Sequence, residues 1–371
     1  MYDIALIGLG PAGATVARLL SKDFKVIALD KAGKTKMGFT KPCGGLLAPQ
    51  AQKIIAELGL TLPKKVLVNP QIFSVKTLDL NCNITRHYQR CYLNLDRFLF
   101  DDWLRSLIDT NTVEVKLNAQ CKNIERIESG FKVSYSLDNS KEQSDFIAKK
   151  IIGADGANSI VRRLLFPDFK LRTRLSVQEW FKDTHKSPQY VCVFDKDTTD
   201  TYAWGLTKDD YFIFGGAFMH HAKDSLEELK AKLEPHGFNL KAPIKTEACL
   251  LVYPQNKYCL GDNGAFLIGE AAGFVSPSSF EGISYALDSA RILATILTEH
   301  ITDCKIDEIN KADKTEKTNK TNKVNLQKIY KRKTKKIRHS LFVRAAKAKI
   351  LYSPFWRKLI LKSKIQSLKI D

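Results

Sequence analysis

The amino-acid sequence predicts an α/β fold, in which a dinucleotide-binding domain carries an inserted, mostly antiparallel β-sheet domain and is followed by a basic helical C-terminal region. Three observations support this prediction. An apolar run at residues 2–7 leads directly into a glycine-rich turn and a helical pattern, residues 61–93 and 171–255 alternate as half-buried strands do, and most of the excess positive charge lies after residue 300. The 371 residues are enough for two domains and a sizeable core.

The first motif joins a buried strand to a glycine-rich turn and a helix. Residues 2–7 are followed at once by Gly8-Leu9-Gly10-Pro11-Ala12-Gly13, and a helix is predicted over residues 13–21. Gly8 permits the tight turn, Gly10 lets the backbone approach a pyrophosphate, and Gly13 lets the helix pack on the strand. The start of that helix offers free N–H groups and a positive dipole end to phosphate.

A second strand, predicted over residues 25–30, ends in an acidic residue. Asp30 lies 22 residues after Gly8, where a carboxylate accepts hydrogen bonds from an adenosine ribose. The neighbouring Lys31 is also expected to contact the cofactor. Taken alone, this unit also fits a nicotinamide cofactor or a glycine-rich turn that binds nothing.

Three later segments favour FAD over a nicotinamide. Arg97 begins a helical pattern and is expected to reach phosphate or ribityl groups of FAD, while Asp101 caps or pairs locally; a surface Arg is the alternative. Residues 150–156 are predicted to be a strand ending in a tight turn at Asp155-Gly156, before a polar helix.

The last of these segments, residues 265–273, is predicted to be a buried strand running into a helix. Gly269 and Gly273 let the backbone approach a ligand there, and the Glu270 carboxylate accepts bonds from ribityl hydroxyls. Because all four segments must converge on one extended dinucleotide, the sequence predicts a Rossmann-like FAD-binding domain. Its parts are residues 1–60, 94–170 and 256–300.

Two further segments carry a resemblance to a known family. Lys41-Pro42-Cys43-Gly44-Gly45 is similar to the Cys-Gly-Gly loop of geranylgeranyl reductases, and Tyr202-Ala203-Trp204-Gly205-Leu206-Thr207 is similar to their Tyr-x-Trp-x-Phe-Pro motif, with Leu and Thr in place of Phe and Pro. The chain thus resembles the FAD-dependent oxidoreductases that include aromatic hydroxylases and geranylgeranyl reductases. Residues 273–284 resemble the CbrA-type flavoproteins of the geranylgeranyl reductase-like branch.

The resemblance implies roles for three side chains. In these reductases the Cys-Gly-Gly loop lies near the flavin ring, so Cys43 is expected to touch substrate or donate a proton; the alternative is a small buried residue between glycines. Tyr202 and Trp204 alternate on one strand face and wall an apolar pocket over the flavin, unless they only pack the sheet core. The remaining expected cofactor contacts are Pro11, Ala12, Lys41, Pro42, Gly44, Gly45, Cys121, Phe274, Gly282 and Ile283.

The resemblance implies a reductase that delivers hydride from flavin N5 to a carbon–carbon double bond of an isoprenoid or other lipid-like molecule. No second nucleotide-binding motif is visible, so the external electron donor is NAD(P)H, ferredoxin or a quinol. Two alternatives stay open. One is a flavin-dependent monooxygenase or halogenase acting on an aromatic substrate, and the other is a membrane-associated flavoprotein that senses redox state or lacks catalysis.

Cysteine usage and the ends of the chain set further limits. The eight cysteines include no Cys-x-x-Cys pair, which argues against iron–sulfur clusters and clustered zinc sites, so no metal is expected. Met1 leads into the first strand without a basic and apolar leader, and no apolar run has the length of a membrane span. These features predict a cytoplasmic protein with reduced thiols.

The C-terminal region, residues 301–371, holds 21 Lys+Arg and 6 Asp+Glu. Residues 305–325 are polar and are predicted to be a solvated linker. Beyond them, residues 350–361 place Trp, Phe and Leu beside cations, and Pro354 is expected at a helix start. This composition suits peripheral binding to the anionic inner face of a membrane. The alternative is a basic helix pair docked on the protein; nucleic-acid binding is disfavoured because no such fold motif is present.

Overall fold

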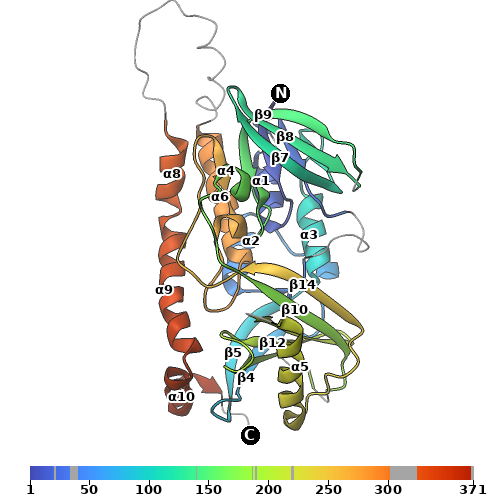
Figure 1. Cartoon of the computed structure of the whole chain (residues 1–371), viewed down its shortest axis with the longest axis vertical. Coiled ribbons are helices and arrows are strands. Elements are labelled where there is room, and N and C mark those ends of the chain that lie inside the picture. Colours follow the sequence, from blue (N-terminus) through green and yellow to red (C-terminus); the bar gives the residue numbers. More distant parts are fainter. Residues whose placement is uncertain are drawn as a thin grey trace, which may run out of the picture.

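The computed structural model describes residues 1–20, 22–33, 41–138, 140–185, 187–188, 190–218, 221–300 and 324–368. Two β-sheets form its body, and three C-terminal helices run along one side of both (Figure 1). The α/β fold class predicted from the sequence is confirmed. Among the described residues, no helix is both long and apolar enough to cross a bilayer.

The seven-stranded sheet has the order β6-β2-β1-β9-β8-β7, with β15 also paired to β9. Its parallel strands are β1 (Tyr2–Ile7), β2 (Val26–Leu29), β6 (Val113–Lys116), β9 (Ser144–Gly153) and β15 (Ala265–Leu267). Strands β7 (Ala119–Ile127) and β8 (Gly130–Leu137) join β9 as an antiparallel meander. All four residues of β2 are buried, because helices and the meander cover both faces of the parallel strands.

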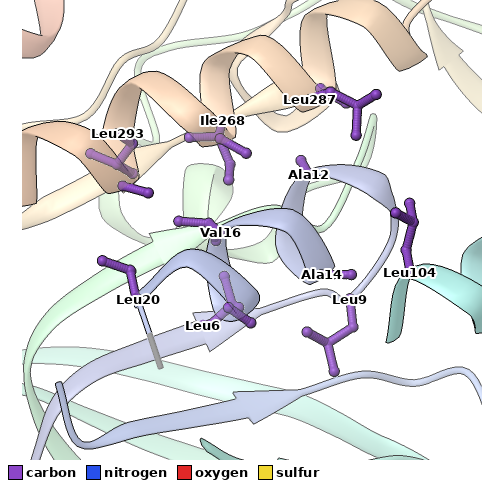
Figure 2. Packing of buried hydrophobic residues seen from close by; sticks show 14 of the residues in the cluster. Leu6, Leu9, Ala12, Ala14, Val16, Leu20, Leu104, Ile268, Leu287 and Leu293 are labelled. Carbon is purple, nitrogen blue, oxygen red and sulfur yellow. The ribbon is translucent and has the colours of Figure 1, made fainter. Parts of the chain in front are cut away.

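Helices α1 and α6 cover one face of this sheet. Helix α1 (Pro11–Leu20) begins two residues earlier than predicted, because the fixed φ of proline suits the first helical position. Its Val16 and Leu20 pack in one buried cluster with Leu293 of α6 (Ile283–Glu299) (Figure 2). The other helices associated with this half of the molecule are α2 (Pro49–Glu57), α3 (Arg97–Ser106) and α4 (Ile160–Leu165).

One predicted boundary was wrong in part. Residues 265–273 contain the expected strand, β15, but the segment after it is only a four-residue 3-10 helix, η3 (Gly269–Ala272). The long helix begins ten residues after Gly273, which ends η3 with a φ of 92°. The intervening residues form a loop that closes back on itself, since the Ser276 N–H donates to the Glu281 carbonyl at 2.8 Å.

The nine-stranded sheet has the order β14-β10-β13-β12-β11-β4-β5-β16, with β3 also on β5. Its strands are β3 (Leu46–Leu47), β4 (Ile72–Asp79), β5 (Ile84–Asn94), β10 (Thr173–Lys182), β11 (Tyr190–Phe194), β12 (Ala203–Lys208), β13 (Tyr211–Phe218), β14 (Lys245–Val252) and β16 (Ser367–Leu368). Among these described strands only β11 and β4 pair in parallel. Helix α5 (Ala222–Leu233) buries Leu226, Leu229 and Leu233 against this sheet.

The C-terminal helices are α8 (Leu326–Lys333), α9 (Lys335–Tyr352) and α10 (Pro354–Ser363), and they dock on the protein (Figure 1). Tyr330 of α8 is fully buried, and Arg357 of α10 forms an ion pair with Asp79 of β4, with Nε 2.6 Å from Oδ2. Pro354 starts α10, as predicted. Most of the predicted linker, residues 305–323, lies outside the described residues.

Candidate functional site

The glycine-rich turn connects β1 to α1 with very little space around two of its glycines. A Cβ on Gly8, whose φ is 96°, would lie 2.7 Å from the Ala154 carbonyl oxygen, and one on Gly13 would lie 1.8 Å from the Gly8 oxygen. A Cβ on Gly10 would meet no heavy atom within 4 Å. Gly8 and Gly13 therefore serve packing, whereas Gly10 borders open space at the start of α1, where backbone N–H groups attract phosphate.

Asp30 joins the end of β2 to this turn. Its Oδ2 accepts a hydrogen bond from the Leu9 N–H at 2.6 Å, and its Oδ1 accepts one from the Ala32 N–H at 2.8 Å. Burial raises the pKa of the Asp30 carboxyl, and the two backbone hydrogen bonds oppose that rise. Each carboxylate oxygen has a further lone pair for a ribose hydroxyl. Lys31 follows with an exposed side chain.

The structure brings the distant sequence segments together at one sheet edge. Gly8, Asp155 and Gly269 each follow the carboxyl end of a parallel strand, respectively β1, β9 and β15. A Cβ on Gly269 would lie 3.1 Å from the Ala12 Cβ, and one on Gly156 would lie 3.7 Å from Oε2 of Glu270. Ligands of open α/β sheets bind at such an edge.

Asp155 holds a buried acceptor that lacks a partner. Its Oδ2 accepts from the Ile160 N–H at 2.6 Å and so caps α4, but its Oδ1 is buried and makes no hydrogen bond within the described chain. Burial raises the pKa of the Asp155 carboxyl. A buried oxygen without a donor is costly unless a ligand supplies one. The pKa of the Cys121 thiol is raised to about 12, mainly by burial and to a smaller extent by the charge of Asp155. Cys121 therefore lies near the Asp155 carboxylate.

Lys41 and Glu270 form an ion pair across the site. Burial pulls the pKa of the Lys41 ammonium down, but the Glu270 carboxylate more than offsets this, and the pKa is raised. The other Glu270 oxygen, Oε1, accepts from the Val252 N–H at 3.2 Å. Glu270 is therefore partly engaged by protein donors, and its binding of ribityl hydroxyls stays a prediction.

The Cys-Gly-Gly loop lies beside Arg97. The Arg97 Nε donates to Asp101 Oδ1 at 2.9 Å, which is the local pairing that the sequence predicted. Burial would lower the pKa of the Arg97 guanidinium, but the charge of Asp101 and then interactions with Cys43 raise it. The Gly45 N–H approaches the Cys43 Sγ at 3.4 Å, and Pro42 accepts a weak bond from the Cys249 thiol at 3.7 Å.

Lys208 is a buried cation at this loop that the sequence reasoning missed. Its Nζ donates to Asn94 Oδ1 at 2.6 Å and to the Leu95 carbonyl at 2.8 Å, and a Cβ on Gly45 would lie 2.9 Å from it. Burial lowers the pKa of the Lys208 ammonium to about 8. Its position in the sequence could have indicated this role. Lys208 directly follows the segment 202–207 and lies four residues after Trp204, so it belongs to the same strand face.

Arg162 is a second missed residue. Its side chain is buried and donates to the carbonyls of Ala271, at 2.6 Å, and Ala157. It thereby ties the turn after β9 to η3. The sequence predicted a polar helix after residue 156, and α4, with Ser159 as its N-cap, is that helix. Nothing local indicated that the Arg162 guanidinium turns inward.

Tyr202 and Trp204 share a strand face, as predicted, with ring centroids 6.1 Å apart. Tyr202 also lies 6.0 Å from Phe194, 5.8 Å from Phe280 and 6.4 Å from Tyr352, and we call these five residues the aromatic cluster. The Trp204 Nε1 is buried and makes no hydrogen bond within the described chain. The sequence missed the other three rings because they come from segments far apart.

The segment from Gly273 to Ile283 holds four expected cofactor contacts, Gly273, Phe274, Gly282 and Ile283. Gly273 has a φ of 92°, and a Cβ there would lie 2.8 Å from the Lys257 oxygen. The Phe274 ring is fully buried against Tyr258, so its side chain belongs to the core. Gly282 is the N-cap of α6, and Ile283 begins that helix with a buried side chain.

Together these groups fit FAD. Open space beside Gly10 suits a pyrophosphate, Asp30 and the unpartnered Asp155 Oδ1 suit hydroxyl groups, and Arg97 supplies positive charge. A model of the FAD binding domain family matches residues 1–219. The chain therefore belongs to the FAD-dependent oxidoreductase and monooxygenase family, and FAD is its cofactor.

Within that family the chain belongs with the CbrA proteins. Protein CbrA of Escherichia coli is 44% identical over 98% of this chain and 96% of its own length. Protein CbrA of Shigella sonnei is 43% identical, with the same coverage of both chains.

Solved structures share the fold at low identity. A geranylgeranyl bacteriochlorophyll reductase-like protein from Thermoplasma acidophilum has a TM-score of 0.77 at 18% identity, covering 98% of this chain and 90% of its own. PqsL, a probable FAD-dependent monooxygenase from Pseudomonas aeruginosa, has a TM-score of 0.67 at 15% identity, covering 98% and 99%. The flavin-dependent halogenase CmlS has a TM-score of 0.65 at 16% identity, covering 96% and 67%.

Proposed function

We propose that this protein is an FAD-dependent reductase that adds two hydrogens to a carbon–carbon double bond of an isoprenoid or another lipid-like substrate. One observation carries the proposal. One face of β12 carries every second residue, namely Trp204, Leu206 and Lys208, and Tyr202 directly precedes the strand on the same side. This face runs from the aromatic cluster to the Cys-Gly-Gly loop. A Cβ on Gly44 would lie 4.0 Å from Leu206, and Lys208 lies against Gly45.

The chemistry divides between cofactor and chain. When FAD is bound and holds two electrons from NAD(P)H, ferredoxin or a quinol, it supplies a hydride for one alkene carbon. The aromatic cluster binds the apolar substrate and excludes water. A proton must reach the second alkene carbon, and we assign its delivery to the Cys43 thiol, which regains the proton from solvent. Arg97 interacts with Cys43 in this loop, and Lys208 donates to the Leu95 carbonyl beside Gly45.

The first test is anaerobic. The purified holoprotein is reduced with dithionite and mixed with a lipid extract from cells that make it, and flavin reoxidation is followed together with lipid mass. The proposal expects reoxidation coupled to a gain of two hydrogens per event. Flavin that stays reduced until oxygen enters contradicts it. A hydroxylated aromatic product would then favour a monooxygenase, the class to which PqsL is assigned, and no product would favour a redox sensor.

A variant tests the aromatic wall. Trp204→Ala is expected to retain FAD but to slow substrate reduction by at least about tenfold, which corresponds to about 1.4 kcal/mol of lost transition-state stabilisation. Trp180→Ala, which removes another tryptophan of the same sheet from β10, is the matched control and is expected to reduce substrate normally. Normal kinetics in Trp204→Ala would remove this residue from the substrate site.

A further inference from the structure

The C-terminal helices expose large apolar side chains on their outer side. On α10 these are Phe355, Trp356, Leu359 and Ile360, which are 65%, 52%, 48% and 41% exposed. On α9, Phe342 and Ile350 are also exposed. We call these six residues the outer face. Phe355, Trp356, Leu359 and Ile360 share one side of α10 by their helical spacing, and exposed apolar residues grouped in this way mark an interaction surface.

Helix α10 turns most of its large apolar side chains toward solvent and buries an arginine, whereas an ordinary surface helix buries its apolar side. Its buried residues are Arg357 and Leu361, which lie four positions apart on the side that packs on the protein. Arg357 is held there by Asp79 and by the Phe194 ring, whose centroid lies 4.5 Å from the guanidinium carbon. The apolar residues are thereby turned outward, and the exposed Lys358 and Lys362 flank them on one side of the helix.

Charge identifies what this face binds. Residues 324–368 contain 14 Lys+Arg and no Asp or Glu. A second copy of the chain would bring the same cations against these and be repelled. A nucleic acid would satisfy the cations but leave Trp356 and Leu359 without an apolar partner. An anionic bilayer satisfies both, because its headgroups attract lysine and its acyl boundary takes up aromatic and aliphatic side chains.

We propose that the outer face of α9 and α10 binds the surface of an anionic lipid bilayer. The structure also connects this face to the proposed substrate wall. Tyr352 lies two residues before the start of α10; its ring stacks on Tyr202, and its hydroxyl donates to the Pro277 carbonyl at 3.2 Å. If the proposed function holds, a lipid substrate in that bilayer adjoins the aromatic cluster. The bilayer contact itself does not depend on that function.

The test measures binding of the full-length holoprotein to sedimented vesicles of phosphatidylcholine with and without phosphatidylglycerol. Binding is expected only when phosphatidylglycerol is present, and added salt is expected to weaken it. Trp356→Ser/Leu359→Ser should weaken binding at least about tenfold, or about 1.4 kcal/mol. Both side chains are exposed, so the variant should retain its fold and FAD content.

A matched control uses exposed apolar residues elsewhere. Ile244 and Leu250 are 62% and 39% exposed; Leu250 lies in β14 and Ile244 directly precedes it. Strand β14 begins the nine-stranded sheet, whereas β5, which α10 contacts, lies near its other end. Ile244→Ser/Leu250→Ser should bind vesicles like the parent protein. Equal binding by both double variants overturns the proposal. The proposal is also overturned if duplex DNA, at the same total negative charge as the vesicles, displaces the protein from them. It is overturned as well if the parent protein self-associates without binding vesicles and Trp356→Ser/Leu359→Ser abolishes that self-association.

These vesicles hold no substrate, and the readout is sedimentation. Loss of the bilayer contact would therefore leave the reductase proposal standing. Conversely, a protein that binds vesicles but reduces no lipid would contradict only the proposed function.

Discussion

At the scale of single residues, the glycine-rich turn separates packing from cofactor access. Gly13 has no room for a side chain because the Gly8 carbonyl lies against it, whereas Gly10 faces open space. The sequence motif predicts that Gly13 allows the helix to pack on the strand and that Gly10 allows the pyrophosphate to approach. Substituting each glycine in turn tests the two roles separately.

Gly10→Val is expected to fold normally but to lose FAD, because a Cβ at this position meets no heavy atom within 4 Å and the new side chain would occupy the space predicted for the pyrophosphate. Gly13→Ala is expected to fold poorly, because its Cβ would lie 1.8 Å from the Gly8 oxygen. Circular dichroism and visible flavin absorbance of the purified variants separate the two outcomes. Full flavin content in Gly10→Val would place the pyrophosphate elsewhere.

Lys208 makes a prediction about pH. Its ammonium has a folded-state pKa of about 8, because burial lowers the pKa below the ordinary lysine value of about 10.4. Between these pH values the unfolded chain binds more protons, so the free energy of unfolding should rise with pH, by up to about 3 kcal/mol from this group. Lys208→Met should remove that rise between pH 8 and about 10 in urea unfolding.

The control for Lys208 is an exposed lysine. The Lys53 side chain is 67% exposed, and Lys53→Met should keep the pH dependence of the parent protein. If Lys208→Met and the parent protein show the same slope, the burial of the Lys208 charge does not govern stability in this range.

At the scale of elements, α10 depends on one buried ion pair with β4. Arg357→Met leaves the fully buried Asp79 carboxylate without its cation and should lower the free energy of unfolding by about 3–5 kcal/mol. Arg357→Met/Asp79→Asn should recover part of this loss, because the uncompensated charge is removed. Urea unfolding of the single and double variants measures both changes. A double variant no more stable than Arg357→Met would contradict the explanation.

The element β12 shows how far local pattern reaches. Alternation predicted that Tyr202 and Trp204 share a face, and the structure bears this out. The pattern did not reveal that the same face continues to Lys208 and the Cys-Gly-Gly loop, because the contacts of Leu206 with Gly44 and of Lys208 with Gly45 join residues more than 150 positions apart in the chain.

At the scale of the whole molecule, the C-terminal helices connect the two sheets. The Tyr330 hydroxyl donates to the Leu267 carbonyl at 3.0 Å in the seven-stranded sheet, while Arg357 binds Asp79 in the nine-stranded sheet. Strand β16 then adds to β5, with Ser367 opposite Tyr88. These contacts should make the two sheets unfold together.

A chain ending at residue 323 is expected to unfold in two steps, whereas the full chain unfolds in one. Flavin fluorescence reports loss of the cofactor site, and circular dichroism reports loss of secondary structure, as urea is increased. A chain lacking only residues 369–371 keeps every contact named above and should behave as the full chain. Coincident transitions in the shortened chain would show that the helices do not couple the sheets.

The sequence by itself determined the dinucleotide-binding half of this protein. A buried parallel strand, a glycine-rich turn and a terminal acid such as Asp30 are constrained locally, because each must meet the backbone geometry of a cofactor. The motifs at Cys43 and Tyr202 extended this to the family resemblance. Charge and composition also identified the basic region after residue 300.

Tertiary structure alone decided which side chains face one another. Lys208, Arg162, Phe280 and Tyr352 join the candidate site through contacts between distant segments, and no local periodicity encodes such contacts. The same holds for α10. Its composition fitted both a docked helix and a membrane-facing helix, and it docks by Arg357 and Leu361 because the buried Asp79 carboxylate requires a cation, which leaves its apolar residues pointing outward.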